Sequence, residues 1–320
     1  MSKKTSIGGQ ALIEGIMMKG PYKTMMAVRK KNGSIDLTEV PEKHLRDKCR
    51  VFGWPLIRGM VNLIESMIVG YKCLMMSADI SGFTDLEDET DSDGSKCEAE
   101  EKKESAFMGV VTVISAVLGV VLAVLLFMYL PSQTFRFIEW LAKTELRAWK
   151  GLIEGVIKII IFVGYIALVS LEKDIKRVFM YHGAEHKTIF CYEHGEELTV
   201  ENVRKFKRFH PRCGTSFMFL MIVVGIVLGT VLALLLPSFI VDKIWLWVPL
   251  KILLVPLTCG VGYEIIRLCG KSDNWFTRIV AAPGLWVQRL TTKEPDDDMI
   301  EIAIAAVEGV IPEDGADEIK

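Results

Sequence analysis

The sequence predicts a mainly α-helical, polytopic membrane protein with four transmembrane helices, a small N-terminal α+β cytoplasmic module and a helical cytoplasmic loop. The chain has 320 residues, of which 51% are hydrophobic, and its mean hydropathy is +0.33. Its apolar residues are gathered in long blocks, and a spanning helix needs about 20 such residues in a row. The net charge of −2 gives no indication of nucleic-acid binding.

Four windows are long and apolar enough to cross a bilayer: 106–130, 151–171, 215–236 and 244–266. The first and third contain no charged residue. Near the start of the second, Glu154 and Lys158 stand one helical turn apart. We interpret them as an ion pair that reaches the outer membrane surface. The alternative is a path for a substrate or a proton through the bundle.

The basic residues that flank these windows predict the orientation, because lysine and arginine concentrate in cytoplasmic loops. The segment 172–214 carries nine of them, against four in 131–150 and one in 237–243. Four spans then place both termini and the segment 172–214 in the cytoplasm. The seven cysteines form no C-x-x-C pair, which suits a reducing compartment.

The other parts of the chain have distinct patterns. Within the N-terminal module, residues 1–78, the segment 22–40 predicts a β-hairpin that turns at Asn32-Gly33. Residues 51–78 predict a helix that lies in the membrane interface, with a fifth span as the alternative. The glycine-rich segment 8–21 fits either a tight backbone loop near a site or a structural turn.

The remaining boundaries follow from composition. Residues 79–105 hold eleven acids and three lysines, which is typical of a flexible linker. Residues 106–293 form the four-helix membrane bundle with its His/Cys-rich loop 172–214. Residues 294–320 form a cytoplasmic helix and tail, and the acids at the start of that helix complement its N-terminus.

The candidate chemistry lies in the segment 181–215, which holds four of the five histidines. His182 and His186 belong to an H-x-x-E-H motif, the spacing of inverted zinc proteases. On a helix over 181–191 both imidazoles face the same way and can bind one divalent metal. Glu185 beside them can hold a water as general base. The candidates for the remaining ligands are His210, Cys213, Glu193 and His194.

These candidate ligands allow two kinds of metal coordination. His182, His186, His210 and Cys213 together form a closed, structural shell, whereas two histidines with one thiolate or carboxylate leave a position free for catalysis. Imidazole and thiolate ligands favour Zn²⁺ among the divalent metals. The plain alternative is that these are polar residues at helix ends or at the headgroup boundary.

Several long motifs resemble the YqhQ-like family over nearly the whole chain: "GGQALIEGIMMKGP", "YHGAEHKTIFCYE", "HPRCGTSF" and "LTTKEPDDDMIEIAIAA". The resemblance implies a multi-pass protein of the bacterial plasma membrane and a metal-dependent enzyme of uncharacterised activity. It agrees with the metal site that the histidine spacing predicts.

Three classes of function fit these observations. The first is a metal-dependent hydrolase at the cytoplasmic face, with a peptide or lipid-linked substrate. The second is a non-enzymatic adaptor in the lipid bilayer whose His/Cys cluster is structural and which binds a protein partner. The third is a transporter, although four spans with few buried charges make a poor transport path. An open metal position distinguishes the first class from the second.

Overall fold

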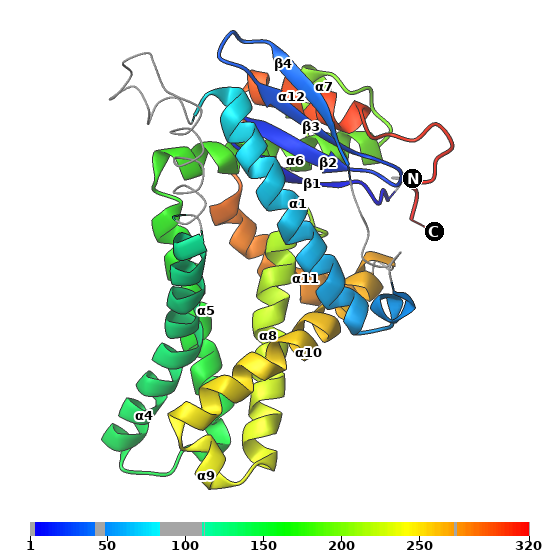
Figure 1. The fold of residues 1–320 in the computed structure, drawn as a ribbon. Helices are drawn as coiled ribbons and strands as arrows, with labels where there is room; N and C mark the ends of the chain where they lie inside the picture. Colours follow the sequence, from blue (N-terminus) through cyan, green and yellow to red (C-terminus); the bar gives the residue numbers. More distant parts are fainter. Residues whose placement is uncertain (1–3, 42–48, 84–110, 112, 272–273, 320) are drawn as a thin grey trace, which may run out of the picture. The chain divides into compact units, whose positions relative to one another are not determined.

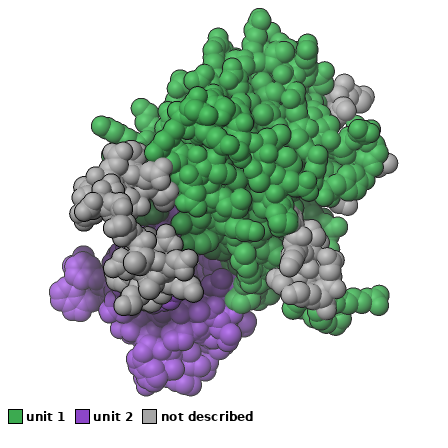
Figure 2. All heavy atoms as spheres, turned by 45° about the horizontal axis from the view of Figure 1, so that its top comes forward, with its two compact units in different colours: residues 1–87, 163–221, 256–320 green, residues 88–162, 222–255 purple. Residues whose placement is uncertain are grey.

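The computed structural model describes residues 4–41, 49–83, 111, 113–271 and 274–319. The chain divides into two compact units, which Figure 2 shows in different colours. Unit 1 comprises residues 1–87, 163–221 and 256–320, and unit 2 comprises residues 88–162 and 222–255.

Unit 1 contains a four-stranded antiparallel sheet in the order β1-β2-β3-β4 (Figure 1). The strands are β1 (Gly8–Leu12), β2 (Gly15–Lys19), β3 (Thr24–Arg29) and β4 (Ile35–Val40). The predicted hairpin over 22–40 is confirmed as β3–β4, and Gly33 takes the left-handed conformation in its turn. The segment 8–21 is a second hairpin, β1–β2, where the sequence predicted only a loop or a turn.

The second hairpin lacks the alternation of polar and apolar residues that marks a half-exposed strand, because both faces of β2 are covered. Side chains alternate along a strand, so Met17 and Met18 point to opposite faces and join different hydrophobic cores. The turn itself is tight. Glu14 has a positive φ of 50°, and a side chain on Gly15 would meet the Ala27 carbonyl oxygen at 2.6 Å.

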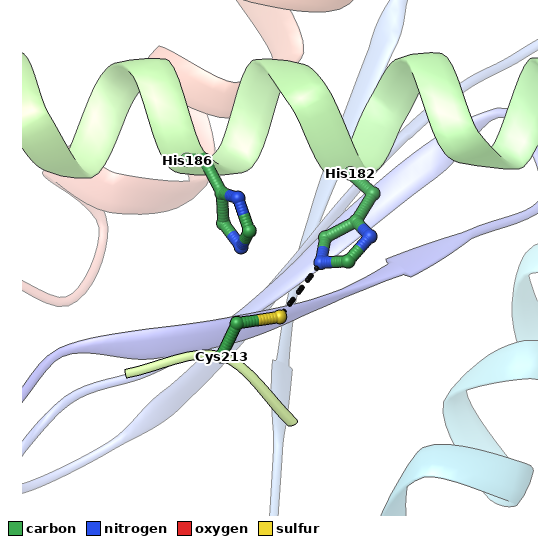
Figure 3. Close-up of side chains that lie close together, drawn as sticks. All are labelled: His182, His186 and Cys213. Carbon is green, nitrogen blue, oxygen red and sulfur yellow. Dashed lines mark hydrogen bonds between the residues drawn. The ribbon is translucent and has the colours of Figure 1, made fainter. Parts of the chain in front are cut away.

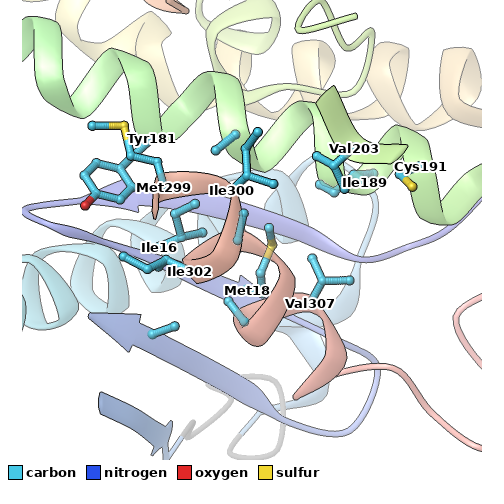
Figure 4. Packing of buried hydrophobic residues seen from close by; sticks show 14 of the residues in the cluster. Ile16, Met18, Tyr181, Ile189, Cys191, Val203, Met299, Ile300, Ile302 and Val307 are labelled. Atoms are coloured by element: carbon cyan, nitrogen blue, oxygen red, sulfur yellow. The ribbon is translucent and has the colours of Figure 1, made fainter. Parts of the chain in front are cut away.

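One face of the sheet packs against two helices, α6 (Lys173–Glu193) and α12 (Asp297–Glu308), whose buried residues form the core in Figure 4. The short α7 (Val200–Arg204) closes this core with Val203. The predicted boundary at residue 294 separated the C-terminal helix from the N-terminal module. In the structure they share one core, because Met299 and Ile300 of the helix belong to the same buried cluster as Ile16 and Met18 of β2.

Helix α1 (Ile57–Ser81) covers the other face of the sheet with Cys73 and its neighbours. The predicted helix over 51–78 is therefore present, preceded by a 3₁₀ turn, η2 (Arg50–Gly53). Its N-terminal part packs on α10 (Ile244–Lys271): Arg58 binds Glu264 at 2.5 Å. The outward face of α1 exposes a helical stripe of apolar residues, Ile64, Met67, Ile68, Tyr71 and Met75. Its position in the membrane interface stays a prediction.

Among the described residues, four helices are long and apolar enough to cross a membrane: Val113–Ala142, Arg147–Val169, Gly214–Leu235 and Ile244–Cys269. The last three closely match the predicted windows. The first extends past the predicted end at residue 130, through a π-helical turn, η3 (Leu125–Tyr129), into α4 (Leu130–Ala142). Pro131 lies directly after this π-helical turn, where the regular i→i−4 hydrogen-bond pattern is already interrupted. Residues 79–81 belong to α1, and the rest of the predicted acidic linker, apart from 82–83, lies outside the described residues.

The interpretation of Glu154 and Lys158 as an ion pair is wrong. Glu154, on α5 (Lys150–Val169), is buried and binds Lys251 of α10 at 2.5 Å. The sequence could show only the local spacing of four residues, whereas the partner comes from a helix almost a hundred residues away. The other elements are η4 (Arg147–Trp149), α8 (Gly214–Leu235), α9 (Ser238–Val241) and α11 (Trp275–Thr291).

The predicted orientation can be tested at two exposed loops. Thr144 follows α4 and Glu197 follows α6, and both are exposed. Because segment 172–214 carries the excess of basic residues, a membrane-impermeant maleimide added to intact cells is expected to label Thr144→Cys and to miss Glu197→Cys. The unsubstituted chain shows the background from native cysteines, and both variants should react after permeabilisation. Labelling of Glu197→Cys in intact cells would reverse the topology.

Candidate metal centre

The predicted helix over 181–191 is confirmed as part of α6, and it places His182 and His186 on the same face (Figure 3). Their ring centroids are 4.4 Å apart. Cys213 precedes the first residue of α8 and points its sulfur at the two rings. One ligand atom from each of the three residues lies within 4.8 Å of the others. A site therefore forms where two segments separated by some thirty residues meet.

Hydrogen bonds to main-chain carbonyls fix which nitrogen of each histidine carries the hydrogen. His182 Nδ1 lies 2.8 Å from the Thr291 carbonyl oxygen, and His186 Nδ1 lies 2.6 Å from that of Arg208. A carbonyl oxygen only accepts, so both Nδ1 atoms donate. In a neutral imidazole the lone pair then lies on Nε2. Outer hydrogen bonds of this kind orient histidine ligands in metal sites.

The Cys213 sulfur lies against these lone pairs. His182 Nε2 is 3.1 Å from Sγ, and Thr215 Oγ1 is 3.3 Å away. Burial acts to raise the pKa of Cys213, but the charge of His186 and its hydrogen bond to the sulfur outweigh burial, so the pKa is lowered. Burial also lowers the pKa of His186. Each shift eases the loss of a proton, and a metal binds the deprotonated form of either group.

His210, which the sequence placed among the metal ligands, lies outside this group. Its ring centroid is 5.6 Å from that of His186, and its Nε2 faces Glu193 Oε2 at 3.5 Å. Glu193 is in turn engaged by Arg212 and accepts from the Thr5 N–H at 2.9 Å. His194, at the end of α6, is exposed and its Nδ1 bonds to the Phe190 carbonyl oxygen. Of the candidate ligands beyond the H-x-x-E-H motif, Cys213 alone joins the cluster.

Glu185 is buried next to the cluster, with 5% of its surface exposed. The Gly9 N–H donates to its Oε1 at 3.1 Å. Its Oε2 has no hydrogen-bond partner among the described residues. Burial raises the pKa of Glu185 to about 7, although the charge of His182 opposes this increase. The carboxyl group thus has one oxygen held by β1 and the other free for a proton.

The backbone of β1 reaches Glu185 because residue 9 is glycine. A Cβ at this position would lie 3.1 Å from Glu185 Cδ and 2.6 Å from the Met17 carbonyl oxygen. The "GG" of the segment 8–21 therefore permits a close approach at the candidate site, in a strand rather than in the loop that the sequence predicted.

The cluster borders a cavity of about 410 Å³ inside unit 1. Glu185, His186 and Cys213 line it on one side, and the backbone of β1 and residues of α1 line it on another. A small molecule or a short peptide segment can enter a space of this size. The centre is therefore next to a space in which a substrate could meet it.

Helix α11 supports the centre, and the sequence reasoning missed it. The side chain of Gln288 is fully buried: its Oε1 accepts from the His210 N–H at 2.8 Å, and its Nε2 donates to the His210 carbonyl oxygen at 2.7 Å. Thr291, one turn further, supplies the carbonyl that holds His182. A stripe of small and polar residues at helical spacing, Thr277, Gly284, Gln288 and Thr291, could have indicated this buried face.

The comparisons with known proteins agree with the resemblance seen in the motifs. A family model described as "Protein of unknown function (DUF1385)" matches residues 54–313. The "Uncharacterized protein YqhQ" of Bacillus subtilis (strain 168) is 38% identical over 301 residues, which is 93% of this chain and 89% of that protein. No solved structure matches the chain. The chain therefore belongs to the DUF1385 family, and the relative confirms the resemblance to YqhQ-like proteins.

Proposed function

We propose that this protein is a membrane-bound, zinc-dependent hydrolase in which His182, His186 and Cys213 hold the metal and Glu185 is the general base. One observation carries the proposal. Both Nδ1 atoms already donate to main-chain carbonyls, so two Nε2 lone pairs and a sulfur converge on one point. Three electron-pair donors in contact with one another repel unless a proton or a metal ion lies between them.

The donor set and its spacing fit zinc. Zn–N bonds of about 2.0–2.1 Å and Zn–S bonds of about 2.3 Å put tetrahedral ligand atoms roughly 3.5 Å apart. The observed separations, 3.1 Å from His182 Nε2 to Cys213 Sγ and up to 4.8 Å within the group, bracket that value. Magnesium and calcium prefer oxygen ligands, whereas thiolate with imidazole suits zinc.

The position of His210 favours a catalytic metal over a structural one. A closed shell needs a fourth protein ligand, and the described residues bring only three ligand atoms together. Three protein ligands with an adjoining cavity leave the fourth position to water or substrate, which is the arrangement of catalytic zinc sites. This supports the hydrolase over the adaptor with a structural His/Cys cluster.

The residues have distinct roles in the proposed reaction. Bound zinc supplies a Lewis acid and lowers the pKa of a water molecule that it binds. Glu185 takes a proton from the attacking water on its free Oε2 and returns it to the leaving group. The Gly9 N–H holds Oε1 and so fixes the direction of the carboxyl group. The carbonyls of Thr291 and Arg208 keep both imidazoles turned toward the metal.

The surroundings of the cavity favour a peptide over other substrates. β1 is the edge strand of the sheet, and Gly8, Gly9 and Gln10 of this strand line the cavity, with the Gly9 N–H already bonded to Glu185. An extended peptide could add to such an edge through main-chain hydrogen bonds and present one of its amide bonds to the metal. A lipid-linked molecule delivered from the membrane is the alternative substrate.

Metal analysis of the purified protein tests the site. We expect about one zinc ion per chain, because three protein ligands complete one site. His186→Ala removes a ligand that is 1% exposed and is expected to lose the zinc. His194→Ala is the matched control, since this exposed histidine caps the end of the same helix without joining the cluster. Equal zinc in the wild type and in His186→Ala would refute the proposed centre.

A further inference from the structure

The membrane helices of unit 2 contain a cluster of buried cations that the metal centre does not use. Lys150 of α5 and Lys251 of α10 are 4% and 7% exposed. Lys158 is half-buried on α5, and its charge and that of Lys150 act on Lys251. Among the described residues of unit 2, Glu154 is the only buried acid. Lys150 also interacts with the less buried Asp242 and Glu139, so Glu154 is the one buried carboxylate beside the three ammonium groups among the described residues.

Each oxygen of the Glu154 carboxylate already accepts a hydrogen bond. Lys251 Nζ donates to its Oε2 at 2.5 Å, and Ser132 Oγ donates to its Oε1 at 2.8 Å. Lys251 also donates to Ser132 Oγ at 2.8 Å. Glu154 thus neutralises one lysine, and two positive charges in the cluster have no buried counter-charge among the described residues.

The neighbours of the remaining lysine are aromatic rings and a carbonyl. Lys150 donates to the carbonyl oxygen of Val241. Its Nζ lies 5.4 Å from the centre of the Phe135 ring and 5.3 Å from that of Trp247, which Lys251 also approaches, to 5.2 Å. Aromatic faces attract cations but accept no conventional hydrogen bond. Two of the three ammonium hydrogens of Lys150 therefore need another acceptor.

Trp247 adds a second unmet donor. This side chain is 1% exposed, and its Nε1–H has no partner among the described residues. An indole N–H can only donate. Buried polar groups in native proteins nearly always have a partner, and each exception needs an explanation. Among the buried groups described here, hydrogen-bond donors thus exceed acceptors at one place in the bundle.

We propose that this cluster binds a phosphate group, with Lys150, Lys158 and the Trp247 N–H as its donors. A phosphate carries negative charge and several acceptor oxygens, so one group satisfies donors from α5 and α10 together. This site is separate from the metal centre, and neither depends on the other.

The headgroup of an anionic lipid is the source that the position favours. Lys150 is the first residue of α5, and Lys251 lies seven residues after the start of α10, which is about 10 Å along a helix. This is the depth at which basic residues and tryptophan meet lipid headgroups. Further along α5, Leu152, Val156 and Ile160 are exposed and offer an apolar surface for acyl chains.

Thermal melting of the full-length protein in lipid nanodiscs tests this site. Nanodiscs contain phosphatidylcholine alone, phosphatidylcholine with one part in five of phosphatidylglycerol, or phosphatidylcholine with added inorganic phosphate. We expect phosphatidylglycerol to raise the wild-type melting temperature. Lys158→Gln and Trp247→Phe are expected to need about tenfold more phosphatidylglycerol for the same increase, because each loses one donor to a charged group.

Two variants make the result decisive. Trp247→Phe keeps an aromatic ring for both lysines and loses only the N–H, so it separates donation from packing. Lys243→Gln removes an exposed lysine near the same end of α10 and should respond like the wild type. If inorganic phosphate stabilises the protein, and Lys158→Gln and Trp247→Phe weaken that effect, the result would support the site with a free anion as its ligand. The proposal would be overturned if neither phosphatidylglycerol nor inorganic phosphate stabilised the protein. Equal stabilisation of the wild type, Lys158→Gln and Trp247→Phe would overturn it as well.

Discussion

Replacing Glu185 with glutamine is expected to leave the zinc in place and to lower hydrolytic turnover by about 10²–10⁴-fold, the usual contribution of a general acid–base residue. Glutamine has nearly the same shape, and its carbonyl oxygen can still accept the Gly9 N–H that now bonds to Oε1. It cannot take up a proton at the position of Oε2, the oxygen without a partner. Catalysis and metal binding should therefore separate in this variant.

Zinc-dependent hydrolysis of p-nitrophenyl acetate provides the measurement, because a small activated ester needs no specific recognition to enter a cavity of about 410 Å³. Glu196→Gln, an exposed acid just beyond α6, is the control and should keep full turnover. Full turnover in Glu185→Gln would make this carboxylate structural. Loss of zinc in the same variant would instead make it a metal ligand, contrary to the assignment of Cys213.

The sequence predicted those features that depend on local spacing. The i, i+4 spacing of His182 and His186 brings both rings to one face of any α-helix, and α6 is such a helix. Asn32-Gly33 between two β-prone runs predicted the turn between β3 and β4. The long apolar windows predicted the helices that could span a membrane. Each of these needs only a stretch of neighbouring residues.

Features that depend on distant partners could not be predicted in this way. His210 and Cys213 are three residues apart, and only the packing of their loop on Gln288 decides which of them faces the histidines. The β1–β2 hairpin is covered on both faces, which removes the alternation that marks a strand. Likewise, the partner of Glu154 is Lys251, 97 residues further along the chain.

Replacing Gly183 with alanine is expected to cost about 1–3 kcal/mol of unfolding free energy or more, the range for overpacking a filled interior. Gly183 lies on α6, directly after His182 and three residues before His186. A Cβ at this position would be 2.0 Å from the Lys293 carbonyl oxygen. That carbonyl cannot move aside easily, because the Lys293 N–H donates to the Phe179 carbonyl oxygen at 2.8 Å. The added methyl group must therefore push α6 away from the segment that joins α11 to α12.

The same displacement should weaken zinc binding. Thr291, two residues before Lys293, supplies the carbonyl oxygen that holds the ring of His182, so a shift of this segment releases the ring from its orientation. Loss of such an outer hydrogen bond typically costs about 10–100-fold in metal affinity. Denaturant unfolding and zinc competition in detergent measure the two effects. Gly164→Ala on α5 is the control, since a Cβ there meets nothing within 4 Å. Unchanged stability and zinc affinity in Gly183→Ala would show that the segment at Lys293 does not rest against α6, and the anchoring of His182 by Thr291 would lose its basis.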